Sequence, residues 1–562
     1  MVEKGRLRSW ELSLPENADI RNVMKAMGYS DDDLGGERPL IAIANSWNTL
    51  IPGHFNLDLI AEYVKKGIHR AGGVAFEFGV IGICDALAKL SPNYVLPSRE
   101  IICYSVELMA KANPIDGIVL IGSCDKIIPG MLMAAARLNM PAILLNAGPM
   151  LGGIEFGGKK SDATTVTEAY GIYHAGRISE EEYKVLEDFS CPTCGSCSFM
   201  GTANTMGCLA EAIGMTLPGS AATPAIYAQR LRIAEATGEA ICRLVRRGIK
   251  ARDIIGERSL ENAVKVCIAI GGSTNAVLHL TALAYEAEAR IDILEAFEKH
   301  GKAVPVIAKV NPASKWDMED FYRAGGIPRV IERLRPLLNM DVMTCTGTSL
   351  EETIRAYRFA FPDRREVIRT LEDPFDTFGG IAVLRGNLAP NTGISKPAAI
   401  DPSVRRFTGK AIVFDSEEEA NRAILDGTVR EGHVVVIRYE GPKGGPGMRE
   451  MYRALKYLYG LGLNRSTAVI TDGRFSGTNA GCFVAHISPE AQEGGPIAIV
   501  KNGDTITIDV EAGIIHLHVE EGEIERRLKE WRRPEPKVRE GYLSLYARLA
   551  SSAHEGAIIK YR

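Results

Sequence analysis

The sequence lacks several features that mark membrane, secreted or nucleic-acid-binding proteins. No apolar run approaches the ~18 residues of a membrane span, and the first ten residues have no apolar signal-peptide core. No block of like charge is long enough for a nucleic-acid-binding arm, and the net charge is −4. Only 11 cysteines are spread over 562 residues, too few for a disulfide scaffold. The sequence therefore predicts a cytoplasmic protein with neither membrane nor nucleic-acid partners.

What the sequence does contain is a regular alternation of short apolar runs and amphipathic segments. The apolar runs predict buried strands at 39–45, 75–84, 117–122 and 141–146. The amphipathic segments predict helices at 57–71, 98–112 and 129–138. This alternation is typical of a parallel sheet with helices on both faces. We therefore expect an α/β fold whose ligands bind at the carboxyl ends of the strands.

Helical periodicity fades near residue 374, and a strand-rich region follows. The later apolar runs predict strands at 411–414, 433–438, 466–470, 496–500 and 505–509. We therefore divide the chain into an α/β domain, residues 1–375, and a largely β, barrel-like domain, residues 380–562. The run 264–270 predicts one more strand in the first domain, before a glycine-rich helix start at 271–276 that could bind an anion.

Candidate metal ligands follow two of the predicted strands. Asp85 ends one strand, and Cys124, Asp125 and Lys126 follow another. Carboxylates prefer hard ions such as Mg²⁺ and thiols prefer iron–sulfur centres, so two distinct inorganic centres are indicated. Taken alone, Asp85 is equally well explained as a helix N-cap, and Asp125–Lys126 as a surface ion pair.

Three further thiols, Cys191, Cys194 and Cys197, lie at a spacing of three. Thiolates this close can converge on one soft metal centre. A ferredoxin-type pattern is excluded because its fourth cysteine would stand at Gly201. Half of a structural zinc site and buried free thiols remain open alternatives.

Two glycine-rich loops in the second domain carry reactive side chains. The loop 441–450 presents Glu450, and the loop 471–478 presents Arg474 and Ser476. Neither loop matches the Gly-x4-Gly-Lys-Ser/Thr pattern that binds nucleotide phosphates. Taken alone, each is explained as a tight turn.

Five segments together resemble the dihydroxy-acid dehydratase and phosphogluconate dehydratase family: 122–131, 191–206, 271–275, 441–448 and 472–477. The resemblance implies a hydro-lyase that converts a 2,3-dihydroxy acid to a 2-keto acid with an iron–sulfur cluster and a magnesium ion. It further implies that Cys124 and Cys197 bind the cluster and that Ser476, as an alkoxide, accepts the C2 proton. The magnesium ligands that it implies are Asp85, Asp125, Lys126 as its carbamate, and Glu450.

The chain departs from the family pattern in two places. Members with a two-iron cluster have a third cysteine after the first-loop proline, whereas this chain reads Pro52-Gly53-His54. It therefore resembles the subgroup with a four-iron cluster, and we take Cys194 as third ligand, with Cys191 and then Cys84 as alternatives. The segment 86–94 also differs from the family, and we expect its Lys89 and Asn93 to help select the substrate.

The substrate implied first is 2,3-dihydroxyisovalerate or its methylvalerate homologue, in branched-chain amino-acid biosynthesis. An aldonic acid such as gluconate is the alternative. An iron–sulfur sensor on the same fold is the non-enzyme alternative, but it would need neither Glu450 nor Ser476. The family resemblance also predicts a homodimer or homotetramer.

Overall fold

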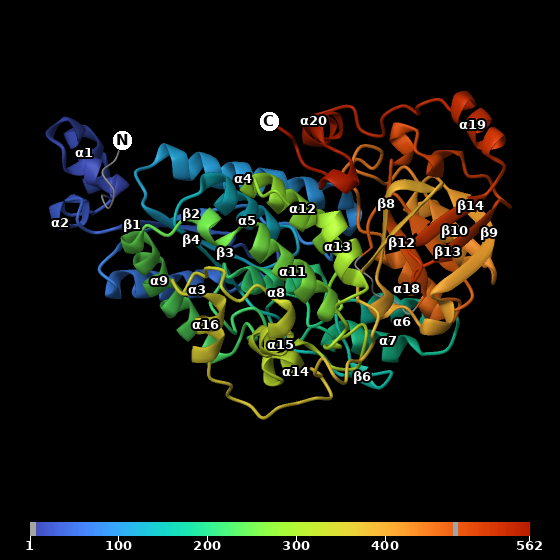
Figure 1. Cartoon of the computed structure of the whole chain (residues 1–562), viewed down its shortest axis with the longest axis horizontal. Helices are drawn as coiled ribbons and strands as arrows, with labels where there is room; N and C mark the ends of the chain where they lie inside the picture. Colours follow the sequence, from blue (N-terminus) through green and yellow to red (C-terminus); the bar gives the residue numbers. More distant parts are fainter. Residues whose placement is uncertain (1–6, 476–480) are drawn as a thin grey trace.

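A computed structural model of the chain describes residues 7–475 and 481–562. Ser476 therefore lies outside the described residues. Figure 1 shows two parts side by side: an α/β part, blue to yellow, and a barrel, orange to red. This arrangement confirms the predicted fold class, an α/β/α layered region followed by a β-rich, barrel-like region. Among the described residues, every helix is too short or too polar to span a lipid bilayer.

The α/β part contains a four-stranded parallel sheet of order β2-β1-β3-β4. The strands are β1 (Leu40–Asn45), β2 (Val74–Gly79), β3 (Gly117–Gly122) and β4 (Ala142–Asn146). One face of the sheet is covered by α3 (Leu57–Arg70) and α9 (Ala228–Arg247), and the other by α4 (Val95–Ala112) and α5 (Ile127–Leu138). The predicted strand 75–84 ends early, at Gly79, so that residues 80–85 form a loop beyond the sheet edge.

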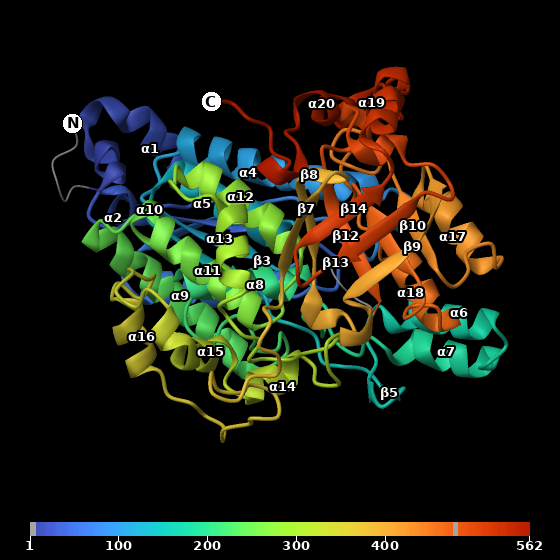
Figure 2. The same ribbon diagram turned by 45° about the vertical axis from the view of Figure 1, so that its right-hand side comes forward.

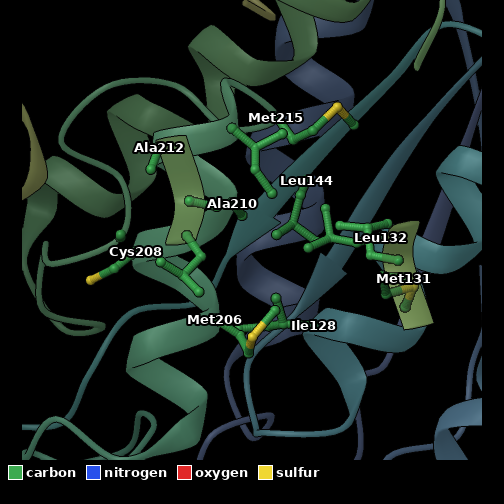
Figure 3. Close-up of a cluster of buried hydrophobic side chains, with 14 of the residues drawn as sticks. Ile128, Met131, Leu132, Leu144, Met206, Cys208, Ala210, Ala212 and Met215 are labelled. Carbon is green, nitrogen blue, oxygen red and sulfur yellow. The ribbon is translucent and has the colours of Figure 1, made fainter. Parts of the chain in front are cut away.

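The helix after the cysteine-rich segment is anchored in the core. All twelve residues of α8 (Thr202–Ile213) are buried. Figure 3 shows Met206 of α8 beside Ile128 of α5, with Leu144 of β4 between the two helices. The loop that carries Cys197 therefore leads into a rigid support.

Two predicted strands are helical in the structure. The run 264–270 belongs to α11 (Glu257–Ala269), whose second half is buried on all sides. Periodicity alone cannot distinguish a short buried helical segment from a buried strand. The run 496–500 is a 3₁₀ helix, Pro496–Ile499, which begins at a proline that has no N–H for a strand ladder.

The second part is a closed eight-stranded barrel of order β10-β11-β12-β8-β7-β14-β13-β9. Its strands are β7 (Ala382–Gly386), β8 (Ala389–Ser395), β9 (Arg406–Phe414), β10 (His433–Ile437), β11 (Ala468–Thr471), β12 (Cys482–Ser488), β13 (Thr505–Asp509) and β14 (Ile514–His518). Strands β9 to β12 are parallel. Two of the connections between them contain α17 (Glu417–Leu425) and α18 (Tyr452–Leu461). The other pairs are antiparallel except β14 with β7.

The end of the chain returns to the α/β part, as Figure 2 shows beside α4. Arg99 of α4 is fully buried, and its guanidinium donates to the carbonyls of Gly556 (2.8 Å) and Ala557 (2.9 Å). The Tyr542 hydroxyl donates to the Pro97 carbonyl over 3.0 Å. These bonds fasten the last residues of the chain to a helix formed by its first hundred or so.

Candidate active site

One cavity collects residues from both parts of the molecule. From the α/β part it is lined by Asp85, which follows β2, and by Cys124 and Asp125, which follow β3. From the barrel it is lined by Glu450, in the loop after β10. The structure thus brings together side chains that are more than 300 residues apart in sequence.

The Lys126 amine lies between two carboxylates. Lys126 is fully buried, and its Nζ donates to Asp85 Oδ2 (3.0 Å) and to Asp125 Oδ2 (2.5 Å). Burial by itself would raise the pKa of Asp85, but the nearby Lys126 ammonium holds it well below its usual value. Burial and the neighbouring Asp85 charge raise the pKa of Asp125 well above its usual range. The two carboxyls therefore do not ionise independently. The negative charge is favoured on Asp85, where the Lys126 ammonium stabilises it.

The barrel contributes a carboxylate held by two donors. Glu450 Oε2 accepts from Arg474 Nη1 and from Asn275 Nδ2, each over 2.8 Å. Arg474 is fully buried, and its Nη2 lies 3.6 Å from Asp85 Oδ1. Arg474 therefore links the carboxylate of the barrel to that of the α/β part. Arg474 was predicted only as a reactive side chain of a glycine-rich loop, with no role assigned. Asn275 was not predicted as a site residue, and its place in the glycine-rich motif 271–275 is the one signal that could have found it.

The carboxylates of this site have capacity left for a cation. Asp85 Oδ1, Asp125 Oδ1 and Glu450 Oε1 are buried oxygens that accept no hydrogen bond from any residue the structure describes. Such groups carry a large desolvation cost unless a positive charge or a donor meets them. In the described part of the chain, however, no three His, Cys, Asp or Glu side chains enclose a single ion by themselves. A cation here would need a further ligand, and a carbamate on Lys126, which lies between Asp85 and Asp125, would supply one.

Three thiols line the same cavity: Cys84, Cys124 and Cys197. Burial raises the pKa of the Cys197 thiol well above its usual value, so a thiolate there requires a compensating positive centre. Cys194 is not among the lining residues, and Cys191 is exposed. Of the three cysteines predicted to bind the cluster, Cys124 and Cys197 line this cavity and Cys194 does not, whereas Cys84 does.

The motif 271–275 connects the two parts of the molecule. Besides the bond from Asn275 to Glu450, the Thr274 hydroxyl donates to the Phe475 carbonyl. The Ser273 and Thr202 hydroxyls are hydrogen bonded over 2.8 Å. Its polar side chains thus fix the barrel loops against the α/β part.

The segment 86–94 places its two predicted selectivity residues differently. The Asn93 amide donates to the carbonyls of Gly445 (2.6 Å) and Pro446 (2.7 Å) in the first glycine-rich loop. The Lys89 ammonium lies 5.7 Å from the centre of the Tyr452 ring, and Tyr452 lines the cavity. Asn93 is therefore occupied in joining the two parts, whereas Lys89 lies beside the cavity wall.

Comparisons with known proteins show which family the chain resembles. The model of the dihydroxy-acid/6-phosphogluconate dehydratase N-terminal region matches residues 38–353, and that of the C-terminal region matches residues 366–557. The dihydroxy-acid dehydratase of Pyrococcus furiosus is 51% identical over 552 residues, covering 97% of this chain and 98% of that protein. The dihydroxy-acid dehydratase of Caldanaerobacter subterraneus subsp. tengcongensis is 49% identical over 549 residues, with the same shares covered.

Proposed function

Because the chain belongs to the dihydroxy-acid/6-phosphogluconate dehydratase family, we propose that it removes water from a 2,3-dihydroxy acid to give a 2-keto acid. The observation that carries this proposal is a cavity whose walls contain both carboxylates and thiols. The relatives named dihydroxy-acid dehydratase favour a branched-chain dihydroxy acid, in valine and isoleucine biosynthesis, over an aldonic acid. Membership of a family of dehydratases also disfavours the sensor alternative. Assembly as a homodimer or homotetramer stays a prediction.

The carboxylate side of the cavity suits a magnesium ion. Asp85, Asp125 and Glu450 each offer an oxygen that no donor within residues 7–475 and 481–562 satisfies, and oxygen ligands are those that Mg²⁺ prefers. Carbamylation of Lys126 would replace its ammonium by a fourth carboxylate-like ligand at the same place. Arg474 and Asn275 hold the Glu450 carboxylate toward that side.

The thiol side of the cavity suits an iron–sulfur cluster, with Cys124 and Cys197 among its ligands. When bound, the magnesium would stabilise negative charge on the carboxylate and C2 oxygen of the substrate, and the cluster would act as a Lewis acid on the C3 hydroxyl. The chain would supply the base: Ser476 follows Phe475, whose carbonyl is held by Thr274. Ser476 would accept the C2 proton after a nearby cation has lowered its pKa.

The proposal is tested by anaerobic purification and a keto-acid assay on 2,3-dihydroxyisovalerate, its methylvalerate homologue and gluconate. We expect turnover of the two branched-chain substrates, abolished by a magnesium chelator and restored by Mg²⁺. Preference for gluconate would support the sugar-acid alternative. Absence of any keto acid from an iron-loaded protein would overturn the proposal.

A further inference from the structure

We propose that Cys84, and not Cys194, is the third protein ligand of the iron–sulfur cluster, together with Cys124 and Cys197. The inference rests on the proposed function, because it names a ligand of a cluster that the function requires. It differs from the expectation that the sequence raised, in which the three closely spaced cysteines supply the ligands.

The loop after β2 places Cys84 at the junction of the two groups of ligands. The Cys84 carbonyl accepts from the N–H groups of Leu87 (3.1 Å) and Ala88 (2.9 Å), which fixes a turn at this point. Cys84 lines the cavity together with Cys124 and Cys197. The partial exposure of Cys84 is thus exposure to the cavity.

Cys194 is not among the residues that line this cavity, although Cys197 of the same loop is. Gly195 has a φ of +129°, a conformation that favours glycine. A Cβ at Gly195 would lie 2.4 Å from the Met150 nitrogen, so no other residue fits there. The Gly195 N–H donates to the Pro52 carbonyl over 3.0 Å, which ties the turn to the first loop. The turn is fixed in this way between Cys194 and Cys197, and of these two thiols only Cys197 is among the residues that line the cavity.

The first loop offers no competing ligand. A Cβ built at Gly53 would lie 3.1 Å from Cys124 Sγ, so this residue packs directly against that thiol. The His54 ring next to it is fully buried, and its Nδ1 lies 2.7 Å from the Ser46 carbonyl. Three thiolates from Cys84, Cys124 and Cys197 leave one iron of a four-iron cluster without a protein ligand. An open metal position is what Lewis-acid catalysis requires.

The first experiment compares Cys84→Ser with Cys194→Ser and Cys191→Ser, all purified anaerobically. Iron and acid-labile sulfide per chain, visible absorbance and EPR after reduction are measured, and circular dichroism reports the fold. We expect Cys84→Ser to fall at least ~3-fold in iron, because a hard oxygen replaces a soft thiolate. The other two variants should keep wild-type iron. Loss of iron in Cys194→Ser with full retention in Cys84→Ser would overturn the assignment.

A second experiment uses the unmodified protein, so that a folding defect in a variant cannot decide the outcome. Thiols are alkylated anaerobically before and after removal of the cluster and located by mass spectrometry. Cys84 should be labelled only after removal, whereas Cys194 should be labelled in both states. Protection of Cys194 alone would contradict the inference. A wild-type protein that never binds iron and sulfide would instead count against the cluster of the proposed function itself.

Discussion

The two parts of the molecule differ in architecture but supply their site residues in the same way. The α/β part has an open parallel sheet, and its contribution comes from the loops after β2 and β3. The barrel is closed and only half parallel. Its contribution, Glu450 and Arg474, follows β10 and β11, which are parallel neighbours within that half.

This comparison indicates that the site side chains come from loops after parallel strands, whether the sheet is open or closed into a barrel. Carboxyl ends of adjacent parallel strands meet at one edge, and their loops converge there. Among the described residues that line the cavity, none comes from β7, β8, β13 or β14, where antiparallel pairing prevails. The α/β part supplies the thiols and two carboxylates, and the barrel supplies one carboxylate with the arginine that holds it.

The largest effect should come from the α/β side. Lys126→Ala removes the group between Asp85 and Asp125 and should lower turnover by at least ~1,000-fold, since several kcal/mol of charge stabilisation are lost. Bound magnesium, measured by metal analysis, should fall with it. Lys65→Ala is the matched control, because Lys65 also contacts two carboxylates, Glu62 (2.6 Å) and Glu77 (2.7 Å), but outside the cavity. Unchanged magnesium content and turnover in Lys126→Ala would show that the α/β part does not supply the metal site in the proposed way.

The next effect tests the barrel side. Ser476→Ala should lower turnover by at least ~100-fold, the low end of a general-base contribution. Iron, magnesium and the thermal midpoint should be retained, while exchange of the C2 proton with solvent is lost. Ser466→Ala is the control, since its hydroxyl donates only to the Leu463 carbonyl (3.3 Å). A near-normal rate with both metals bound would assign the base to another group.

The contact between the two parts should have a smaller effect. Asn275→Ala removes one donor to Glu450 and should lower turnover roughly 10- to 100-fold, because a hydrogen bond to a charged group contributes roughly 1.5–3 kcal/mol. The apparent affinity for magnesium should weaken in the same variant. The control is Asn262→Ala, a buried asparagine whose amide donates to the Asn339 carbonyl (2.9 Å) far from the cavity. If both variants behave alike, Asn275 supports only the fold.

The smallest effect concerns substrate choice. Asn93→Ala should lower the free energy of unfolding by about 1–2 kcal/mol, for two lost hydrogen bonds to carbonyls. The ratio of activities on dihydroxyisovalerate and gluconate should stay unchanged. Asn113→Ala, which loses one exposed bond to the Met109 carbonyl (2.8 Å), should change stability by less than ~0.5 kcal/mol. A shifted activity ratio would restore the selective role that the sequence predicts for Asn93.

Strands that are buried along their whole length could be predicted from the sequence. β1 and β3 are buried along their whole length, so an unbroken apolar run marked them correctly. The same signal failed at α11, because a helix buried on all sides also presents an unbroken apolar run. Strand ends could be predicted as ligand positions, because they follow from parallel topology alone.

The candidate site was predictable only in part, because the spacing of residues along the chain does not determine which side chains reach the cavity. Cys194 matched a metal-binding spacing, but it is not among the residues that line the cavity. Cys84 stood at a strand end, yet a single thiol carries no pattern. Arg474 and Asn275 act through contacts over 24 and 175 residues of sequence. The first contact needs the folded barrel, and the second exists only once the barrel has docked on the α/β part.

Two hydrogen bonds of Arg99 can form only late in the synthesis of the chain. Its guanidinium is buried against carbonyls that lie 457 and 458 residues later in the chain. At ~5–20 residues per second, a ribosome needs on the order of tens of seconds to a minute and a half to make that stretch. During that time α4 can form and pack, but two acceptors of a buried charge are not yet made. Until the ribosome has made Gly556 and Ala557, Arg99 therefore lacks two of the acceptors that it has in the folded protein. Complete packing of α4 has to wait for the end of translation.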